Sequence, residues 1–522
     1  MEECSGHTEC KVPGPPKLPR RVIMVAEDTN ALKLLETNNL YAEYIALSYC
    51  WGGPQESITI RSTLDDRLTY IDESALSQTI RDAVKVAREL GFRYLWIDAL
   101  CIIQDCKEDK ILEIAKMHQY YHHASLTLVA ASPVSAQDGF LRRQTAPACI
   151  IPYHSTDGRS DTLHLEHLVH DPDSYPYKPT QQFSTELRNP TARRAWTLQE
   201  DILSPRKLIY GARCIDWACR HHGANMSGNG RFKTAQSGTV EYDPPRLNFF
   251  STHPSPSNTT AVNSWWSIVA EYSSRFLTDP EDKLLAISAV AQAIRTKTEW
   301  TYLAGLWAET FSFDLLWSMD ADNLKRYEPT IQPARNWRAP SWSWACMDGR
   351  IETPAGADVQ AGVCRLVGAS VLPQDLRAPY GNVKPGSFVD IYGKLRNLGK
   401  SFQQLDEAEH TDLRLDSDTY AEFEMSALLI AIRDNALRPQ DNELEDLRSA
   451  LQSLPNGHDE ARACIEQLIL RMEYSQGQKP EAVGLLLCPI SVNPKVYHRL
   501  GIFLSLPLED FDDIEPSVIR IA

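Results

Sequence analysis

The residue types and spacing around Glu200 indicate a site for carboxylate chemistry. Glu200 closes the run Arg194-Ala195-Trp196-Thr197-Leu198-Gln199-Glu200, in which Trp196 precedes it by four residues and Gln199 by one. Residues at i, i+3 and i+4 of an α-helix project from one face, so a helix here would present all three together. A carboxylate in a water-poor pocket can hold substrate hydroxyl groups and stabilise developing positive charge. Glu200 is therefore our candidate catalytic residue, and core packing remains an equally open role for Trp196.

A second group of polar and aromatic residues falls where predicted strands end. The run 44–49 is short and apolar and stops at the turn Trp51-Gly52-Gly53-Pro54, while the run 94–97 is apolar on both faces and stops at Asp98. In a parallel sheet, ligands bind at the carboxyl ends of the strands. The residues that fall at these ends are Ser48, Tyr49, Trp51, Gly52, Asp98 and Cys101.

These strand-end residues have binding roles and structural alternatives. Ser48 and the backbone of Gly52 can bind hydroxyl or phosphate oxygens, and Trp51 can stack on a flat heterocycle. Ser48 can equally be a turn hydroxyl, and Asp98 can cap the turn that follows its strand. Arg194 is a candidate partner for a phosphate or for the nearby glutamate, with a structural salt bridge as its alternative role.

Two other chemistries remain open from the residues alone. Cys101 could be a nucleophile whose base comes from the histidines of the following helix, which are His118, His122 and His123. Asp98 and Glu200 could instead form the paired carboxylates of a hydrolase.

The cysteines do not indicate a metal site. The chain has 12 Cys, scattered rather than arranged as a disulfide framework, and we expect mostly free thiols in a reducing compartment. One local cluster, Cys214, Cys219, His221 and His222, has a spacing that fits no common zinc pattern. We predict buried structural cysteine beside a surface histidine pair there, and hence no metal ion.

The elements that must position these residues alternate between strand and helix. Strands are predicted at residues 21–25, 44–49, 94–97 and 126–131. Ser77 and Gly91 bound an amphipathic helix, Asp105 can cap a second helix that continues to Tyr121, and Asn189-Pro190 opens a third. This alternation with short connections predicts an α/β layer with a parallel sheet and right-handed crossovers.

The length of 522 residues suggests two or three domains. We predict a lead-in over residues 1–40 and a first domain over 41–205, which contains a polar insertion at 137–190. A mainly helical region over 206–345 follows, with a mobile loop at 223–260. The last region, 346–522, contains β-strands and a charged, helical insertion at 403–475. The β-like runs of the last region are 388–395 and 483–506, so we expect a mixed α+β architecture there.

Charge and hydropathy exclude several classes of function. Lys+Arg 53 against Asp+Glu 69 gives a net charge of −16, which argues against non-specific binding to nucleic acid or to an anionic membrane. The N-terminus lacks the basic and apolar regions of a signal peptide. No apolar run approaches the roughly 18 residues that span a bilayer. We therefore expect a soluble, cytoplasmic protein.

Residues 44–52, 95–105 and 194–200 form three separated, Trp-containing blocks. Their composition and order resemble the signature blocks of the fungal heterokaryon-incompatibility (HET) domain, and the resemblance covers residues 41–205. Residues 302–307 and 339–344 also resemble segments often found C-terminal to this domain. Ile103 departs from the pattern, because the family commonly has Asn there, and this bears on a polar contact near Gln104.

The HET domain is in turn similar to the TIR fold. TIR domains that cleave NAD carry a Trp followed four residues later by the catalytic Glu, a spacing that Trp196 and Glu200 share, and their first strand ends in a Ser-bearing loop, as at Ser48. The resemblance implies a TIR-like (flavodoxin-like) parallel sheet flanked by helices, followed by a mixed α+β C-terminal region. It assigns catalysis to Glu200. The residues that would bind the substrate are Ser48, Tyr49, Trp51, Gly52, Asp98, Arg194, Trp196 and Gln199.

The resemblance further implies a role in heterokaryon incompatibility, programmed cell death and innate immunity. One hypothesis is an NAD glycohydrolase, activated by assembly into a homo-oligomer, with NAD as substrate rather than cofactor. A different nucleotide hydrolase or transferase that uses the same pocket is a second hypothesis. The alternative is a non-catalytic interaction module, in which the same residues hold the fold and the region 206–522 binds a protein partner to trigger cell death.

Overall fold

A computed structural model provides the structure of the protein. The residues that it describes are 14–25, 32–141, 189–211, 215–220, 258–319, 337–352, 363–397 and 511–522, the strand segments 148–154, 160–166, 413–415, 466–473, 481–492 and 495–507, and the single residues 4, 6, 7 and 10. The chain divides into two compact units, Met1–His253 and Pro254–Ala522, and each is described by itself. The predicted boundaries at residues 205 and 345 do not coincide with this division.

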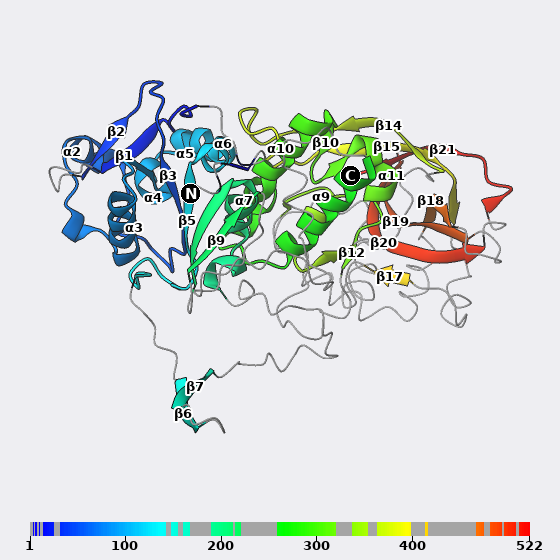
Figure 1. Ribbon diagram of the computed structural model, residues 1–522. Helices are drawn as coiled ribbons and strands as arrows, with labels where there is room; N and C mark the ends of the chain where they lie inside the picture. Colours follow the sequence, from blue (N-terminus) through cyan, green and yellow to red (C-terminus); the bar gives the residue numbers. More distant parts are fainter. Residues whose placement is uncertain are drawn as a thin grey trace, which may run out of the picture. The chain divides into compact units, whose positions relative to one another are not determined.

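The first unit is built on a seven-stranded sheet with the order β2-β1-β4-β3-β5-β8-β9 (Figure 1). Its strands are β1 (Arg21–Val25), β2 (Leu32–Glu36), β3 (Ile45–Ser48), β4 (Tyr94–Trp96), β5 (Leu126–Ala130), β8 (Arg206–Tyr210) and β9 (Ile215–Cys219). The inner strands β4, β3, β5 and β8 run parallel, and β1, β2 and β9 are antiparallel to their neighbours. The predicted α/β layer is therefore present, in a mixed sheet whose core is parallel.

The strand order changes direction at β3. The chain passes from β3 outward to β4 and then returns to β5 on the other side of β3. Such a reversal opens a crevice at the carboxyl ends of the strands, which is where open α/β sheets bind ligands. All four residues of β3 are buried, as a central parallel strand with both faces covered requires.

The first predicted helix agrees with the structure, and the second differs from it. Helix α3 (Gln78–Glu89) follows Ser77 and ends before Gly91, whose φ of 75° lets the chain turn, as predicted. The predicted second helix is instead two helices, α5 (Lys107–Ile114) and α6 (Met117–His123). Asp105 does not cap α5, because its Oδ1 accepts a hydrogen bond from the Arg61 backbone N–H at 2.9 Å and Cys106 occupies the N-cap position.

The helix that carries Glu200 begins later than predicted. Asn189-Pro190 opens only a 3₁₀ turn, Pro190–Arg193, and the α-helix α7 covers Ala195–Leu203. Arg194 separates the two in an extended conformation (φ −94°, ψ 133°) and is the N-cap residue of α7. The Arg194 side chain consequently leaves the backbone outside the helix rather than along it.

The predicted insertion at residues 137–190 contains regular structure. Strands β6 (Ala148–His154) and β7 (Ser160–Glu166) pair antiparallel within it. Its first residues belong to the folded unit, because Phe140 and Leu141 donate backbone hydrogen bonds to the Asp82 carboxylate of α3 at 2.7 and 3.0 Å.

The second unit combines helices with an eight-stranded sheet, a mixed architecture as predicted. Its helices are α9 (Asn258–Ser273), α10 (Ser288–Thr298) and α11 (Phe311–Asp314). The sheet has the order β14-β15-β21-β20-β19-β18-β16, with β17 paired to β20. Its strands are β14 (Arg365–Ser370), β15 (Phe388–Gly393), β16 (Leu395–Asn397), β17 (Leu413–Leu415), β18 (Glu466–Glu473), β19 (Glu481–Val492), β20 (Lys495–Pro507) and β21 (Ser517–Ile521).

Two segment predictions fall on this unit. The described parts of the predicted helical insertion at 403–475 are strands β17 and β18, because their apolar residues pair with β20 and β19. Of the predicted mobile loop at 223–260, residues 223–257 lie outside the described residues, and the last three begin helix α9.

Buried tryptophans form the core between the helices of the second unit. Trp265 and Trp344 both donate their indole N–H to the Gly305 carbonyl, at 3.1 and 2.9 Å. Gly305 has a φ of 101°, and a Cβ there would lie 2.6 Å from the Trp344 indole nitrogen. The segments 302–307 and 339–344, which stand out in the sequence, therefore pack against each other.

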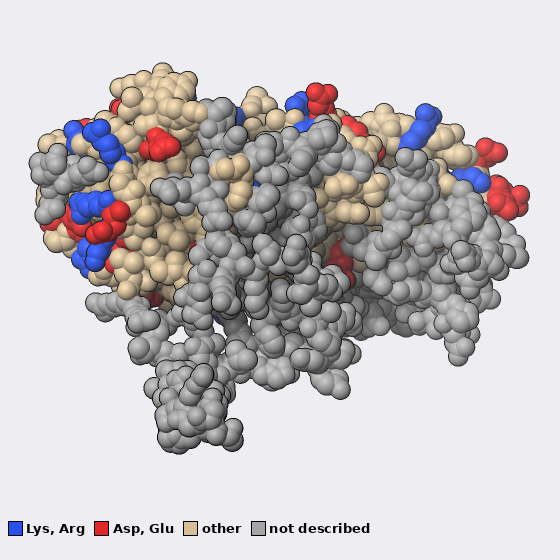
Figure 2. All heavy atoms as spheres, in the orientation of Figure 1, with Lys and Arg blue, Asp and Glu red and all other residues tan. Residues whose placement is uncertain are grey.

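The surface is mixed in charge where the first unit carries α2 (Leu64–Thr69) and α3. Figure 2 shows Lys and Arg side by side with Asp and Glu at that end of the unit. Among the described residues, no helix combines the length and apolar character that crossing a membrane requires.

Candidate functional site

Helix α7 brings Glu200 to the carboxyl end of β3. The Glu200 residue is 6% exposed, and its Oε2 atom has no hydrogen-bond partner among the described residues. Burial raises the pKa of Glu200 to about 8. The nearby Ser48 hydroxyl opposes this increase, the Asp98 carboxylate adds to it, and Arg194 and the Tyr121 hydroxyl oppose it. Such a carboxyl group can change its ionisation state when a charged ligand enters.

Asp98 holds the loop that follows β3. Its Oδ2 accepts a hydrogen bond from the Trp51 indole N–H at 2.9 Å, and its Oδ1 accepts one from the Ala99 backbone N–H at 2.7 Å. Burial raises the pKa of Asp98, although these two donors and the Arg194 charge oppose the shift. Both carboxylate oxygens are thus occupied by donors of the protein, which favours a positioning role for Asp98.

Arg194 lies between the two carboxyl groups. Its guanidinium donates to the Tyr49 carbonyl at 3.1 Å, and its charge acts on both Asp98 and Glu200. The Tyr49 hydroxyl accepts from the Gln55 side-chain amide at 3.3 Å and also interacts with Asp98. The extended backbone at Arg194 is what allows this side chain to reach the strand ends.

The predicted site residues separate into a buried floor and a partly exposed rim. The floor is formed by Ser48, Tyr49, Gln199 and Glu200, with exposures of 3%, 3%, 2% and 6%. The rim residues, which are at least partly exposed, are Trp51, Gly52, Asp98, Arg194 and Trp196. The side-chain amide nitrogen of Gln199 is buried without a hydrogen-bond partner among the described residues. Hydrogen bonds and charge interactions join Ser48, Tyr49, Trp51, Asp98, Arg194 and Glu200. Within the described part of the chain, no such interaction joins Trp196 or Gln199 to this group.

Two residues of the site were not singled out from the sequence. Tyr121 of α6 interacts with Glu200 and donates its hydroxyl to the Leu47 carbonyl at 3.0 Å. Cys50, next to Tyr49, is buried and interacts with Arg194 and Glu200. Cys50 lies inside the first Trp-containing block, so its position was an available signal. Tyr121 was predicted only as the residue to which the second helix continues.

Gly52 fixes the approach of the β3 loop to the loop after β5. Its φ is 75°, and a Cβ at this position would lie 2.5 Å from Ser135 Cα and 2.8 Å from the Val134 carbonyl oxygen. The Ala136 N–H donates to the Trp51 carbonyl at 3.2 Å and ties the two loops together. Gly52 therefore acts through its backbone and its lack of a side chain.

We predict that Gly52→Ala destabilises the first unit more than Gly91→Ala does. Gly91 has the same φ of 75° but nothing within 4 Å of a Cβ, so its substitution isolates the cost of the left-handed conformation, about 1–2 kcal/mol. Gly52→Ala adds an overpacking cost of about 1–3 kcal/mol, because backbone atoms must move. Thermal unfolding of both variants measures the difference. Equal midpoints would show that the two loops do not approach as described.

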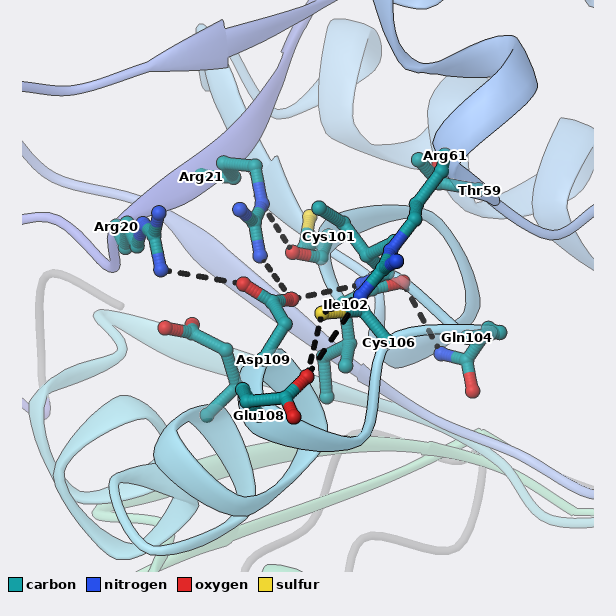
Figure 3. A network of polar contacts seen from close by, with 12 residues as sticks. Arg20, Arg21, Thr59, Arg61, Cys101, Ile102, Gln104, Cys106, Glu108 and Asp109 are labelled. Atoms are coloured by element: carbon teal, nitrogen blue, oxygen red, sulfur yellow. Dashed lines mark hydrogen bonds and ion pairs between the residues drawn. The ribbon is translucent and has the colours of Figure 1, made fainter.

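A network of polar contacts around Asp109 holds the segment that carries Asp98. In Figure 3, Asp109 faces Arg20 and Arg21, and the Arg21 Nε donates to the Cys101 carbonyl at 2.8 Å. Gln104 donates to the Asp98 carbonyl at 3.1 Å. The polar contacts around Gln104 are thus formed even though the preceding residue is Ile103.

The structure argues against a cysteine nucleophile at Cys101. The thiol is fully buried, burial raises its pKa to about 12, and its Sγ accepts from the Ile97 N–H at 3.5 Å. The ring nitrogen of His118 lies 2.9 Å from the Ala115 carbonyl, and that of His122 lies 3.0 Å from Arg220. The thiolate is the nucleophilic form of cysteine, and burial disfavours it at Cys101, so Cys101 is a structural residue.

Comparison with known proteins covers the same part of the chain. Residues 44–200 match the family model described as heterokaryon incompatibility protein (HET). Heterokaryon incompatibility protein 6, OR allele, of Neurospora crassa is 32% identical over 98 residues, which are 17% of this chain and 14% of that protein. No solved structure matches the chain. The family match runs from Tyr44 to Glu200 and so includes all nine predicted site residues.

Proposed function

We propose that the heterokaryon incompatibility domain, which this chain carries at residues 44–200, cleaves NAD at the bond between nicotinamide and ribose. The observation that supports this most is Glu200, a buried carboxyl group with an unpartnered Oε2 beside the Ser48 hydroxyl at the end of a central parallel strand. Because the matched region covers only a small share of the Neurospora crassa relative, the activity is proposed from the site rather than from that protein.

The strand order supports a relationship to the TIR fold. Numbered from β3, the parallel strands β4-β3-β5-β8 have the order 2-1-3-4, which is the order that begins a flavodoxin-like sheet. Glu200 lies on the helix that precedes the fourth of these strands, and Ser48 ends the first. We infer a TIR-like arrangement, in which the Trp196 and Glu200 spacing places a carboxylate at the switch point of the sheet.

One carboxylate is sufficient for this reaction. The bond from C1′ of the ribose to the pyridinium nitrogen breaks with its electron pair going to nitrogen, so nicotinamide leaves as a neutral molecule and needs no acid. Water then adds to C1′ and loses a proton. Glu200, when ionised, holds the ribose hydroxyls and stabilises the positive charge on the ribosyl ring. In this proposal Trp51 and Trp196 at the rim stack on the bases, and Arg194 binds a phosphate.

The proposal is tested by incubating the purified full chain with NAD under conditions that promote its assembly. We expect release of nicotinamide together with ADP-ribose or a cyclic form of it. Substitution of NADP and other nucleotides in the same assay defines the substrate class. If the assembled protein left NAD intact but hydrolysed another nucleotide, NAD would not be the substrate, and the proposed active site would still hold.

The pH dependence of the reaction should report the ionisation of Glu200. Its pKa is raised to about 8, so the active carboxylate form is the minor form at neutral pH. We predict that kcat/KM rises about tenfold per pH unit below this pKa and levels off above it, because kcat/KM reports the free protein. Steady-state rates of nicotinamide release across this range measure the profile. A rate that falls as the pH rises would contradict an ionised Glu200.

The alternative function is an interaction module that triggers cell death without chemistry. The observation in its favour is that Asp98 and Arg194 each form a hydrogen bond with the loop after β3, to Trp51 and Tyr49 respectively. In that case the same residues hold the fold, and the region after residue 205 supplies the binding surface for a protein partner. Assembled protein that turns over no nucleotide, yet retains its cell-death activity with Glu200→Gln, would favour this function.

A further inference from the structure

Three thiols and one imidazole meet at the edge of the first unit's sheet, apart from the site described above. Cys4, His7 and Cys10 come from the start of the chain, and Cys219 is the last residue of strand β9. One ligand atom from each of the four residues lies within 4.8 Å of the others. The three cysteines are 3%, 0% and 2% exposed, and none forms a disulfide.

The distances from His7 to two of the sulfur atoms fit a tetrahedral zinc ion. His7 Nδ1 lies 3.7 Å from Cys219 Sγ and 3.9 Å from Cys10 Sγ. Zn–S bonds of about 2.3 Å and Zn–N bonds of about 2.0 Å at tetrahedral angles place the ligand atoms about 3.5–3.8 Å apart. Three thiolates and one imidazole are a common ligand set of structural zinc sites, in which no coordination position is left open for a substrate.

Local backbone structure presents the first three ligands together. The His7 N–H donates to the Cys4 carbonyl at 3.1 Å, and the Cys10 N–H donates to the His7 carbonyl at 3.2 Å. These two turns repeat every three residues, so the spacing Cys-x₂-His-x₂-Cys brings the side chains into one cluster. The fourth ligand comes from a strand more than 200 residues away, which a metal ion would join to the start of the chain.

The charges around the cluster favour thiolates. Arg206 of β8 is 9% exposed, and its Nε donates to Cys4 Sγ at 3.3 Å while another of its nitrogens donates to the Cys10 carbonyl. No described carboxylate pairs with Arg206. The acidic group that this buried guanidinium contacts is therefore the Cys4 thiol. Three thiolates and Zn²⁺ carry a net charge of −1, which Arg206 would offset. Donors to the sulfur atoms are also the usual surroundings of zinc thiolates.

We propose that Cys4, His7, Cys10 and Cys219 bind one Zn²⁺ ion in a structural site that fastens the start of the chain to edge strand β9. In the sequence, Cys219 stands near Cys214, His221 and His222, whose spacing predicts no metal site; these three neighbours lie outside the described residues. The ligands that the fold brings to Cys219 are distant in sequence. Loss of the ion would release the first residues of the chain from the sheet and lower the stability of the first unit.

The test begins with the metal content of the purified full chain, measured by elemental analysis. We expect one zinc ion per chain in the wild type and in the control Cys106→Ser, whose thiol lies on the same unit outside the cluster. Cys4→Ser and Cys219→Ser should each lose the stoichiometric zinc and unfold at a lower temperature. Wild-type protein that neither contains zinc nor takes it up, when zinc is supplied under reducing conditions, would overturn the proposal.

Cobalt substitution gives a second measurement that does not depend on variants that fold poorly. Co²⁺ in the wild type should show the strong visible absorption of a tetrahedral ion and a sulfur-to-cobalt charge-transfer band that corresponds to three thiolates. Cys219→His keeps four ligands, so we expect tetrahedral Co²⁺ with the charge-transfer intensity of two thiolates. A weak octahedral spectrum in the wild type, or an unchanged thiolate intensity in Cys219→His, would refute this ligand set.

Discussion

Glu200→Gln is expected to lower the rate of nicotinamide release from NAD by about 10³-fold, because it removes the charge that stabilises the ribosyl cation. The substitution keeps the size and hydrogen-bonding shape of the side chain. Its surroundings, the Ser48 hydroxyl and the Tyr121 hydroxyl, can bond to an amide as well as to a carboxyl group. The rate measured by chromatography of the released nicotinamide, at saturating NAD, gives the loss in kcat.

The matched control is Asp201→Asn on the same helix. Asp201 is the next residue of α7, but its side chain is 35% exposed and pairs with Lys207, away from the strand ends. Removal of this charge should leave the rate of nicotinamide release unchanged. If Glu200→Gln and Asp201→Asn turned over NAD at equal rates, Glu200 would not be the catalyst.

Stability measurements separate a catalytic role of Glu200 from a structural one. The folded-state pKa of about 8 lies above the ordinary value of 4.5, so the folded protein binds a proton that the unfolded chain releases between these pH values. Stability is therefore lost as the pH rises through this range. Glu200→Gln cannot ionise, so at pH 8 it should be more stable than the wild type, by about 4 kcal/mol at most, and it should match the wild type near pH 4. A variant that is less stable at both pH values would indicate a structural role.

Four of the seven strands of the first sheet, β1, β3, β4 and β5, were predictable from the sequence because each signal is local. Apolar runs of four to six residues marked β3, β4 and β5, and Ser77 and Gly91 marked the limits of α3. Strands β2, β8 and β9 were not predicted. Charged residues interrupt the apolar residues of β2 and begin β8, and β9 is buried only at its last two residues. The observed sheet therefore has more strands than the predicted one, and its strands β1, β2 and β9 are antiparallel to their neighbours.

The candidate site was predictable as a set of strand ends but not as a set of contacts. The sequence placed Ser48 and Asp98 at strand ends and Glu200 on a helix, and the family resemblance joined Glu200 to them. It could not show that Asp98 gives both carboxylate oxygens to Trp51 and Ala99, because that depends on the turn of the loop after β3. It could not show Tyr121 either, since the break between α5 and α6 sets the rotation of the second helix.

Asp109→Asn is expected to destabilise the first unit by about 3–5 kcal/mol, because it leaves a buried arginine without its counter-charge. Arg21 is fully buried, and Asp109, 5% exposed, pairs with it and with Arg20 and accepts from the Ile103 N–H at 2.8 Å. Burial alone would raise the pKa of Asp109, but the hydrogen bonds and charges of Arg21, Ile103 and Arg20 hold it below its usual range. For a domain of this size the loss corresponds to a decrease of about 10 °C in the unfolding midpoint.

The control for this substitution is the neighbouring Glu108→Gln. Glu108 pairs with Arg61 at 3.6 Å, but both side chains are about two-thirds exposed, at 67% and 64%, so its loss should cost at most about 1 kcal/mol. The difference between the two variants should shrink in acid, because a carboxyl group with a lowered pKa contributes its stability above the ordinary pKa and loses it as the pH falls. Calorimetry of both variants at neutral and acid pH measures this. Equal midpoints at neutral pH would mean that the Arg21–Asp109 pair does not hold the segment 98–109 in place, and the position of Asp98 beside Trp51 would then need another explanation.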